Sequence, residues 1–291
     1  MRVFLTGGSG YVGASVVPAL LRGGHDVTAL ARSESSAAAL AALGATPVRG
    51  DLTDAEVLSG AAAQADGAIH LGAISSGDAA AVDLAAARAM QTGLDGRGAY
   101  VHTGGVWVYG DTDGVVDEDA PKAPPPITAW RVANEEAVLA DADRGGRPVL
   151  VMPGLVYGNG GHLIKAFFTD PGRAAGAVPQ IGDGSGHWSL IHVEDLAELY
   201  VKALDAAPGS VYAAVSDQNV RIADISQALS VAIGRPGSIE TITLEQAIER
   251  MGPIAEAFAL DQQLTGARAR RELKWAPRYL DALAELETAG G

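Results

Sequence analysis

The stretch Thr6-Gly7-Gly8-Ser9-Gly10-Tyr11-Val12-Gly13 decides the fold that this sequence predicts. It follows the apolar run Val3–Leu5, typical of a strand, and opens the run Tyr11–Arg22, typical of a helix. Gly7 allows a tight turn, Gly10 lets the backbone approach a pyrophosphate, and Gly13 lets the helix pack closely on the strand. Backbone N–H groups at the start of the helix would face the phosphates of a dinucleotide. The alternative, a glycine-rich turn without a ligand, suits this strand–turn–helix setting less well.

Short β-branched runs alternate with Ala-rich stretches from Met1 to about Pro153. Strands are predicted at Val3–Leu5, Val27–Leu30, Pro47–Val48, Ala68–Leu71, Ala99–His102 and Val149–Met152. Helices are predicted at Tyr11–Arg22, Glu34–Leu43, Ala55–Ala63, Ala79–Leu94 and Ala129–Ala142. This alternation predicts a Rossmann-like α/β domain over residues 1–153, with a doubly wound parallel sheet covered on both faces.

The pattern is less regular beyond Pro153. Helices are predicted at Val193–Ala206, Ile222–Ile233, Leu244–Arg250, Gly266–Leu273 and Leu280–Leu286, with strands near Val211–Ala214 and Ile239–Ile242. We expect residues 154–291 to form a smaller substrate-capping region, partly interleaved with the Rossmann core. It would lie over the carboxyl ends of the strands, where ligands bind in open α/β sheets.

Composition excludes several classes of protein. The 291 residues include 21 basic and 35 acidic side chains, a net charge of −14, which argues against nucleic acids or anionic membranes as partners. No apolar run approaches the roughly 20 residues that span a bilayer. The N-terminus leads directly into the glycine loop, so we expect no signal peptide and a cytoplasmic protein.

Metal binding is not expected from the sequence either. Cysteine is absent, which removes thiolate ligands and disulfides. The six histidines are scattered, and no two stand at helical ligand spacing beside a carboxylate. We therefore predict no metal.

The end of the second predicted strand indicates the cofactor. NAD-binding enzymes usually carry Asp or Glu there for the ribose 2′-hydroxyl, but this strand ends Ala29-Leu30-Ala31-Arg32-Ser33. Arg32 can bind a 2′-phosphate, with Ser33 and the following helix start as further donors. The alternative for Arg32 is a solvated loop residue. The pattern favours NADP(H).

Further motifs follow in order along the chain. They are Gly50-Asp51-Leu52-Thr53-Asp54, Ile69-His70-Leu71-Gly72-Ala73, Val108-Tyr109-Gly110-Asp111, Pro153-Gly154-Leu155-Val156-Tyr157-Gly158, Ile191-His192-Val193-Glu194-Asp195-Leu196-Ala197 and Ala269-Arg270-Arg271-Glu272-Leu273-Lys274-Trp275-Ala276-Pro277. With the glycine loop, they resemble the extended branch of the short-chain dehydrogenase/reductases, the NAD-dependent epimerase/dehydratase family. Together, the loop and this resemblance imply cofactor contacts by Gly7, Ser9, Gly10, Tyr11, Val12, Gly13, Arg32, Ser33, Asp51, Leu52, Leu71, Gly72, Ala73, Pro153 and Val156.

The chain departs from that family at its catalytic pair. The resemblance implies a Ser or Thr, a Tyr that acts as general acid and base, and a Lys four residues later that lowers the pKa of the Tyr. None of the seven tyrosines here is followed by lysine at that spacing. One register of the corresponding helix puts Trp130 and Asn134 at the two positions, and another puts Ile127 and Arg131 there. Only Thr103 offers a hydroxyl at the serine position.

Three residues remain as catalytic candidates, each with a structural alternative. Tyr109 follows the fifth strand and could be a proton donor, or it could pack in the core. Arg131 could polarise a substrate carbonyl, or pair with Glu135 one helical turn away. Thr103 is the third candidate. A largely aromatic substrate pocket is predicted from Trp107, Trp130, Tyr157, Trp188 and, on a probable lid, His162.

These observations predict an NADPH-dependent oxidoreductase that reduces a small carbonyl, imine or enone compound with an atypical proton donor. Two alternatives stay open: a non-redox isomerase, dehydratase or cyclase, and a protein that senses NADP(H) without turnover. The resemblance also implies a homodimer, which could pair through the Ala-rich helices Ala79–Leu94 and Ala129–Ala142.

Overall fold

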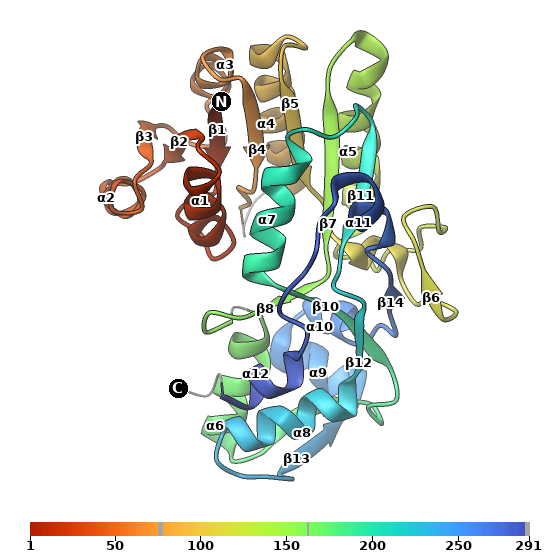
Figure 1. The fold of residues 1–291 in the computed structure, drawn as a ribbon. Helices are drawn as coiled ribbons and strands as arrows, with labels where there is room; N and C mark the ends of the chain where they lie inside the picture. The colour runs from red at the N-terminus through yellow and green to blue at the C-terminus, as the bar shows by residue number, and fades with distance from the viewer. Residues whose placement is uncertain (75–77, 162, 289–291) are drawn as a thin grey trace.

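A seven-stranded parallel sheet forms the centre of the protein. The computed structural model describes residues 1–74, 78–161 and 163–288, and Figure 1 shows the sheet in the upper part of the molecule. The strand order is β11-β7-β5-β4-β1-β2-β3, and every pairing is parallel. The strands are β1 (Arg2–Thr6), β2 (Asp26–Ala31), β3 (Thr46–Arg49), β4 (Gly67–His70), β5 (Ala99–Thr103), β7 (Pro148–Pro153) and β11 (Ser210–Ala214). This confirms the predicted doubly wound α/β fold.

Helices cover both faces of the sheet. One face packs against α1 (Gly13–Arg22), α2 (Glu34–Ala42) and α7 (Val193–Ala203). The other packs against α3 (Ala55–Ala63), α4 (Ala79–Leu94) and α5 (Ala129–Leu139). Central strands such as β7 are therefore buried on both sides and apolar almost throughout. Side-chain caps fix the start of several helices, because Ser33, Asp54 and Asp78 each accept a backbone N–H of the first turn.

A second, smaller body lies below the carboxyl ends of the strands (Figure 1). It contains a three-stranded sheet of β8 (Leu155–Tyr157), β10 (His187–His192) and β12 (Gln218–Arg221), and the pair β9 (Val178–Ile181) with β13 (Ile239–Ile242). Its helices are η3 (Lys165–Thr169), α6 (Asp170–Ala175), α8 (Ile222–Ala232), α9 (Leu244–Met251), α10 (Ile254–Phe258) and α12 (Ala282–Thr288). The rings of Phe168, Trp188 and Phe258 meet at its core.

Short elements join the two bodies. They are η1 (Val106–Tyr109), α11 (Ala267–Leu273) and the pair β6 (Val115–Val116) with β14 (Gln263–Leu264). The short helix η2 (Ala140–Arg144) instead continues α5 toward β7 within the upper body. The chain also returns to the upper body after residue 153, because α7 packs beside α1 and β11 forms the edge of the main sheet. The division at residue 153 therefore separates the two bodies only in part.

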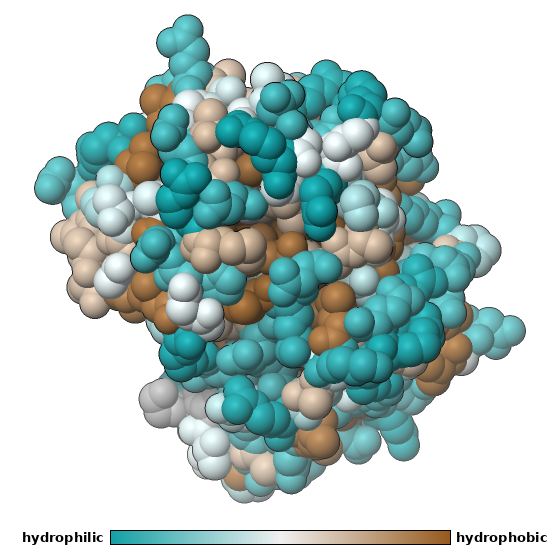
Figure 2. Space-filling model, turned by 45° about the horizontal axis from the view of Figure 1, so that its top comes forward, coloured by the Kyte–Doolittle hydropathy of each residue, from teal (hydrophilic) through white to brown (hydrophobic). Residues whose placement is uncertain are grey.

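Among the described residues, no helix is both long and apolar enough to cross a membrane. The face in Figure 2 is mostly hydrophilic, with hydrophobic residues in scattered patches. This surface agrees with the excess of acidic side chains.

Candidate cofactor and substrate site

The glycine loop between β1 and α1 forms a close-packed cradle. Gly7 has a φ of +71°, and a Cβ atom there would lie 2.7 Å from the backbone nitrogen of Gly72. A Cβ atom on Gly13 would lie 2.2 Å from the carbonyl oxygen of Gly7. The first turn of α1 has no capping side chain and no acidic residue. Its positive end therefore stays available to an anion such as a pyrophosphate.

A cleft of about 540 Å³ runs from this cradle to the ends of β2 and β4. Its lining includes the predicted cofactor residues Gly7, Ser9, Gly10, Tyr11, Val12, Gly13, Arg32, Ser33, Asp51, Leu52, Leu71, Gly72 and Ala73. Leu30, Ser36 and Ile74 complete it. Because β1 and β4 lie on either side of the point where the strand order reverses, the cleft occupies the usual ligand position of a doubly wound sheet.

Arg32 and the start of α2 form the far end of this cleft. Arg32 is exposed and follows the last residue of β2. The Ser33 hydroxyl accepts the Ser36 N–H at 3.1 Å, and the Ser36 hydroxyl accepts the Ser33 N–H at 2.9 Å. Within the described part of the chain, no acidic side chain is in ion-pair contact with Arg32. A cation, two hydroxyls and a helix N-terminus thus meet at one place, which suits a phosphate.

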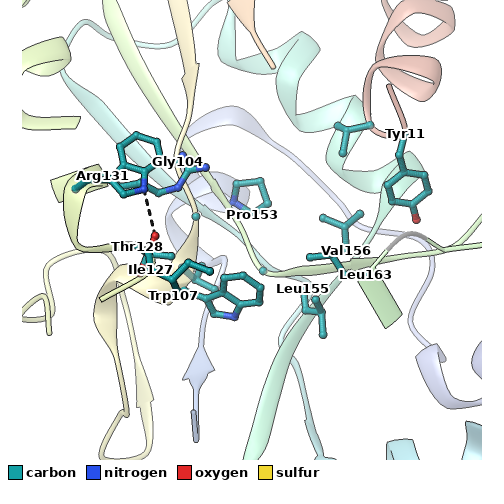
Figure 3. A pocket seen from close by; sticks show the side chains of 15 residues that line it. Tyr11, Gly104, Trp107, Ile127, Thr128, Arg131, Pro153, Leu155, Val156 and Leu163 are labelled. Atoms are coloured by element: carbon teal, nitrogen blue, oxygen red, sulfur yellow. Dashed lines mark hydrogen bonds between the residues drawn. The ribbon is translucent and has the colours of Figure 1, made fainter. Parts of the chain in front are cut away.

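A second pocket of about 310 Å³ adjoins the first and shares Tyr11 and Val12 with it. The predicted residues Trp107, Trp130, Arg131, Pro153 and Val156 line it. It is also lined by Gly104, Gly105, Val106, Ile127, Thr128, Gly154, Leu155 and Leu163, most of which the sequence analysis did not single out. Figure 3 shows Trp107, Ile127 and Arg131 on one side of this pocket and Tyr11 on the other.

Arg131 is the charged side chain of this pocket. Its guanidinium lies 4.5 Å above the ring of Trp130, and its Nη1 donates to the Thr103 carbonyl at 3.4 Å. The alternative pairing with Glu135 is not the contact seen, because Lys122 donates to Glu135 at 3.0 Å. Arg131 is therefore held by an aromatic ring and a carbonyl, and within the described residues it forms no ion pair with a carboxylate.

The structure favours one of the two helix registers. Ile127 and Arg131 both line the pocket. Asn134 instead turns toward α4, where its amide donates to the Ala80 carbonyl at 2.8 Å and to Asp83 at 2.9 Å. Ile127 and Arg131 therefore both lie at the pocket, whereas of the other pair only Trp130 does.

Thr103 lies beside Arg131 at the end of β5. Its hydroxyl is 2.8 Å from the Tyr200 hydroxyl, and both groups can donate or accept. Burial raises the pKa of Tyr200, so this phenol stays protonated at neutral pH. The structure therefore brings Thr103 and Arg131 together, as the sequence analysis expected of catalytic candidates.

Tyr109 requires a correction. Its side chain is 2% exposed, its hydroxyl donates to the Glu118 carbonyl at 3.1 Å, and it packs in a core with Val108 and Met152. Burial also raises the pKa of this phenol. Tyr109 is therefore not among the residues that line the pocket, and its position matches the alternative of a tyrosine packed in the core.

Two predicted pocket residues belong to the core of the lower body instead. The Tyr157 hydroxyl donates to the Tyr279 carbonyl at 3.0 Å, and its ring packs edge-on against His192. Trp188 donates from Nε1 to the Phe258 carbonyl at 3.0 Å. The sequence placed these rings near strand ends, but it did not show which side of each strand faces the pocket. His162 lies outside the described residues.

A polar group that the sequence analysis did not assemble lies next to this site. His70, at the end of β4, and His102, in β5, both face Asp83 of α4. Burial lowers the pKa of His102 to about 3, so its ring is neutral at physiological pH. The sequence held part of the signal, since both histidines lie near the ends of predicted strands, but it did not give the strand order and register that make them neighbours.

Residues 3–214 of this chain match the NAD dependent epimerase/dehydratase family. An uncharacterized protein of Schizosaccharomyces pombe is 30% identical over 98% of each chain. A 4-hydroxy-2-methyl-3-oxo-4-farnesyl-3,4-dihydroquinoline-1-oxide ketoreductase of Stigmatella aurantiaca is 29% identical over 100% of this chain and 98% of its own length.

Solved structures share the fold at lower identity. The dTDP-glucose 4,6-dehydratase of Bacillus anthracis, in complex with NAD, aligns with a TM-score of 0.81 over 99% of this chain and 95% of that one. The identity is 17%, so this likeness concerns the fold.

Proposed function

Because this chain belongs to the NAD dependent epimerase/dehydratase family, we propose that it is an NADPH-dependent ketoreductase. One observation carries the proposal. The predicted dinucleotide cleft continues, through Tyr11 and Val12, into an apolar pocket whose charged side chain is Arg131. Similarity to a ketoreductase over the whole chain supports reduction of a carbonyl.

The choice of NADPH rests on the far end of the cleft. Arg32, the Ser33 and Ser36 hydroxyls and the start of α2 can hold a 2′-phosphate by charge-assisted hydrogen bonds. NAD enzymes usually carry an Asp or Glu after this strand to accept from the ribose hydroxyls, and here that place is taken by Arg32, whose side chain only donates. Gly7 and Gly13 permit the close backbone packing that a pyrophosphate requires. When bound, the cofactor supplies a hydride to the carbonyl carbon.

Arg131 acts as the cationic hydrogen-bond donor to the substrate carbonyl oxygen. Negative charge develops on the carbonyl oxygen as the hydride arrives, and a fixed guanidinium stabilises that charge. Its position over Trp130 and on the Thr103 carbonyl keeps it directed without a carboxylate. A guanidinium is a donor that keeps its hydrogens in proteins, so Arg131 does not supply the proton. Solvent water therefore delivers the proton that completes the alcohol.

The lining of the pocket supports a largely apolar substrate. Trp107, Ile127, Leu155 and Leu163 offer apolar contacts, while Arg131 offers one cationic contact. A ketone on a largely apolar, partly planar molecule satisfies both. Polar sugars would leave most of their hydroxyls without partners against this lining.

The test is direct. Purified protein is mixed with NADPH and a panel of apolar ketones, and loss of the nicotinamide absorbance is followed together with alcohol formation. Stoichiometric consumption of NADPH supports the proposal. Product without net consumption would indicate an isomerase or dehydratase, and NADPH binding without any turnover across the panel would indicate a sensor.

We also propose a homodimer through α4 and α5. These helices pack side by side, and each exposes small residues one helical turn apart: Ala81 and Ala85 on α4, Ala129 and Ala133 on α5. Small side chains allow close approach of helices across a two-fold axis. Sedimentation of Ala85→Arg should show monomers, whereas Ala39→Arg on the exposed side of α2 should leave the dimer intact. A monomeric wild-type protein would contradict this.

A further inference from the structure

The buried polar cluster beside Arg131 is built by the sheet itself. His70 and His102 are direct partners in the parallel pair β4–β5, so their side chains leave the sheet on the same face. Helix α4 covers that face, as Figure 1 shows, and presents Asp83 near its start. Three residues from separate parts of the chain thus converge through strand register and helix packing.

The geometry of the cluster is that of a ligand set. The His70 Nε2 atom lies 3.5 Å from one carboxylate oxygen of Asp83, and the His102 Nε2 atom lies 3.6 Å from the other. One potential ligand atom of each residue lies within 4.8 Å of the other two. Both histidines are 1% exposed, and Asp83 is 12% exposed.

Outer contacts orient both rings. The His70 Nδ1 atom is 2.6 Å from the Thr6 hydroxyl, and the His102 Nδ1 atom is 2.9 Å from the Tyr100 hydroxyl. Each imidazole therefore turns Nε2 toward Asp83. The Nε2 atom of His70 is buried and has no hydrogen-bond partner among the described residues. A buried nitrogen that is held 3.5 Å from a carboxylate oxygen without forming a hydrogen bond calls for an explanation.

We propose that His70, Asp83 and His102 bind a divalent transition-metal ion of the Zn²⁺ type. Zinc binds imidazole nitrogen and carboxylate oxygen at about 2.0–2.2 Å, which places neighbouring ligands of a tetrahedron roughly 3.3–3.5 Å apart. The two nitrogen–oxygen distances are close to this range, but they run to different oxygens of Asp83, and the three ligand atoms lie within 4.8 Å of one another. The side chains would therefore have to close on the ion to complete the set. Two neutral imidazoles and one carboxylate also match the donors that zinc prefers.

Each imidazole must be in one particular tautomer to bind a metal ion. A metal needs the Nε2 lone pair, so each ring must carry its hydrogen on Nδ1. The Thr6 and Tyr100 hydroxyl oxygens can accept those hydrogens, as second-shell partners of zinc-bound histidines do. Asp83 binds as the carboxylate, and Asn134 keeps its hydrogen bond to it. Binding thus requires each ring in its neutral form with the hydrogen on Nδ1.

A small cavity gives the ion an entry and an open position. It has a volume of about 70 Å³ and is lined by His70, Asp83, Thr103 and Arg131, among others. Such a volume can hold water, which would complete the coordination. Three protein ligands plus an open fourth position are typical of catalytic zinc sites rather than structural ones.

The experiment measures binding and needs no turnover, so it stands or falls independently of the proposed function. Chelator-treated protein is titrated with Co²⁺, followed by visible absorption, and with Zn²⁺ in competition with a chromophoric chelator. We expect one equivalent per chain and an inner-sphere cobalt spectrum. Asp83→Asn and His102→Ala should weaken binding more than about 100-fold, and Tyr100→Phe about 10- to 100-fold.

His187→Ala is the matched control. His187 also contacts a carboxylate, that of Asp261 at 3.0 Å, but it lies outside the cluster. This variant should bind Co²⁺ like the wild type. A wild-type protein without a stoichiometric inner-sphere spectrum would overturn the proposal, whatever the variants do. So would unchanged affinity in Asp83→Asn, because the cluster would then be only a buried hydrogen-bond network.

Discussion

The site has two ends that depend on the sequence in different ways: the cofactor cleft, or phosphate end, and the adjoining apolar pocket, or substrate end. The phosphate end is local: Gly7 to Gly13 lie in one loop, and Arg32 directly follows one strand. The substrate end joins η1, the start of α5, the β7–β8 connection and Leu163, which are spread over some sixty residues of sequence. Local motifs have a fixed geometry, so the first end could be assigned residue by residue. The second end could not, because packing decides which side chains face it.

The chemistry differs between the two ends as well. The phosphate end keeps the glycines and donors that its motif requires. The substrate end is lined by Ile127, Trp130 and Arg131, and none of the seven tyrosines has the lysine four residues later that the family pattern expects. A fold can keep its cofactor cradle while its reaction changes. The following experiments test whether the two ends are separable in this way.

Gly13→Ala should have the largest effect. A Cβ atom at Gly13 would lie 2.2 Å from the Gly7 carbonyl oxygen, and a backbone atom cannot move aside as a side chain can. We expect the free energy of unfolding, measured in urea, to fall by about 3 kcal/mol or more, which is the upper end of the cost of overpacking. Cofactor binding should be lost with it.

Gly60→Ala is the control for that change. Gly60 lies inside α3, and a Cβ atom there meets nothing within 4 Å. Alanine at this position should stabilise the protein by roughly 0.5–1 kcal/mol, since glycine costs about that much in a helix. Equal stability of the two variants would show that the glycine cradle is not close-packed.

Arg131→Ala should affect the substrate end alone. Loss of a preorganised donor to a developing oxyanion costs about 10²- to 10³-fold in kcat. The dissociation constant for NADPH should change little, because Arg131 does not line the phosphate end. Arg144→Ala, on an exposed arginine that pairs with Asp141, should leave both quantities unchanged. Full activity of Arg131→Ala would remove it from the mechanism.

Arg32→Ala should affect the phosphate end alone. A charge-assisted contact contributes roughly 1.5–3 kcal/mol, which is about 10- to 150-fold in affinity. NADPH binding should weaken by that factor, while NADH binding stays the same. Fluorescence titration of both cofactors measures this. Equal affinities of the wild type for NADPH and NADH would contradict the assignment.

Most of the main sheet could be predicted from the sequence, because hydrophobic periodicity and turn-forming residues act over short stretches of the chain. The six predicted strands from Val3 to Met152 all lie in the main sheet. The strands β6, β8, β9, β10, β12 and β14 were missed. All but the six-residue β10 have two to four residues, and β9 contains Pro179, so pairing with distant partners makes them strands.

The histidines show the same limit. The prediction of no metal considered ligands on one helix, whereas His70 and His102 meet across two strands and Asp83 reaches them from a helix. Residues 32 positions apart become neighbours through strand register, which sequence spacing alone does not reveal.

Tyr109→Phe should have the smallest effect, and it tests the correction made above. From the sequence, Tyr109 was a candidate for the proton donor because the usual Tyr is missing. In the structure its hydroxyl donates to the Glu118 carbonyl inside a core. Removing one such hydrogen bond should lower the free energy of unfolding by about 0.5–1.5 kcal/mol. The kcat should stay within about threefold of the wild type, whereas loss of a general acid would cost roughly 10²- to 10⁴-fold. A steady-state assay beside urea unfolding separates the two. A hundredfold loss of kcat at unchanged stability would return Tyr109 to the mechanism and require the loop after β5 to rearrange when substrate binds.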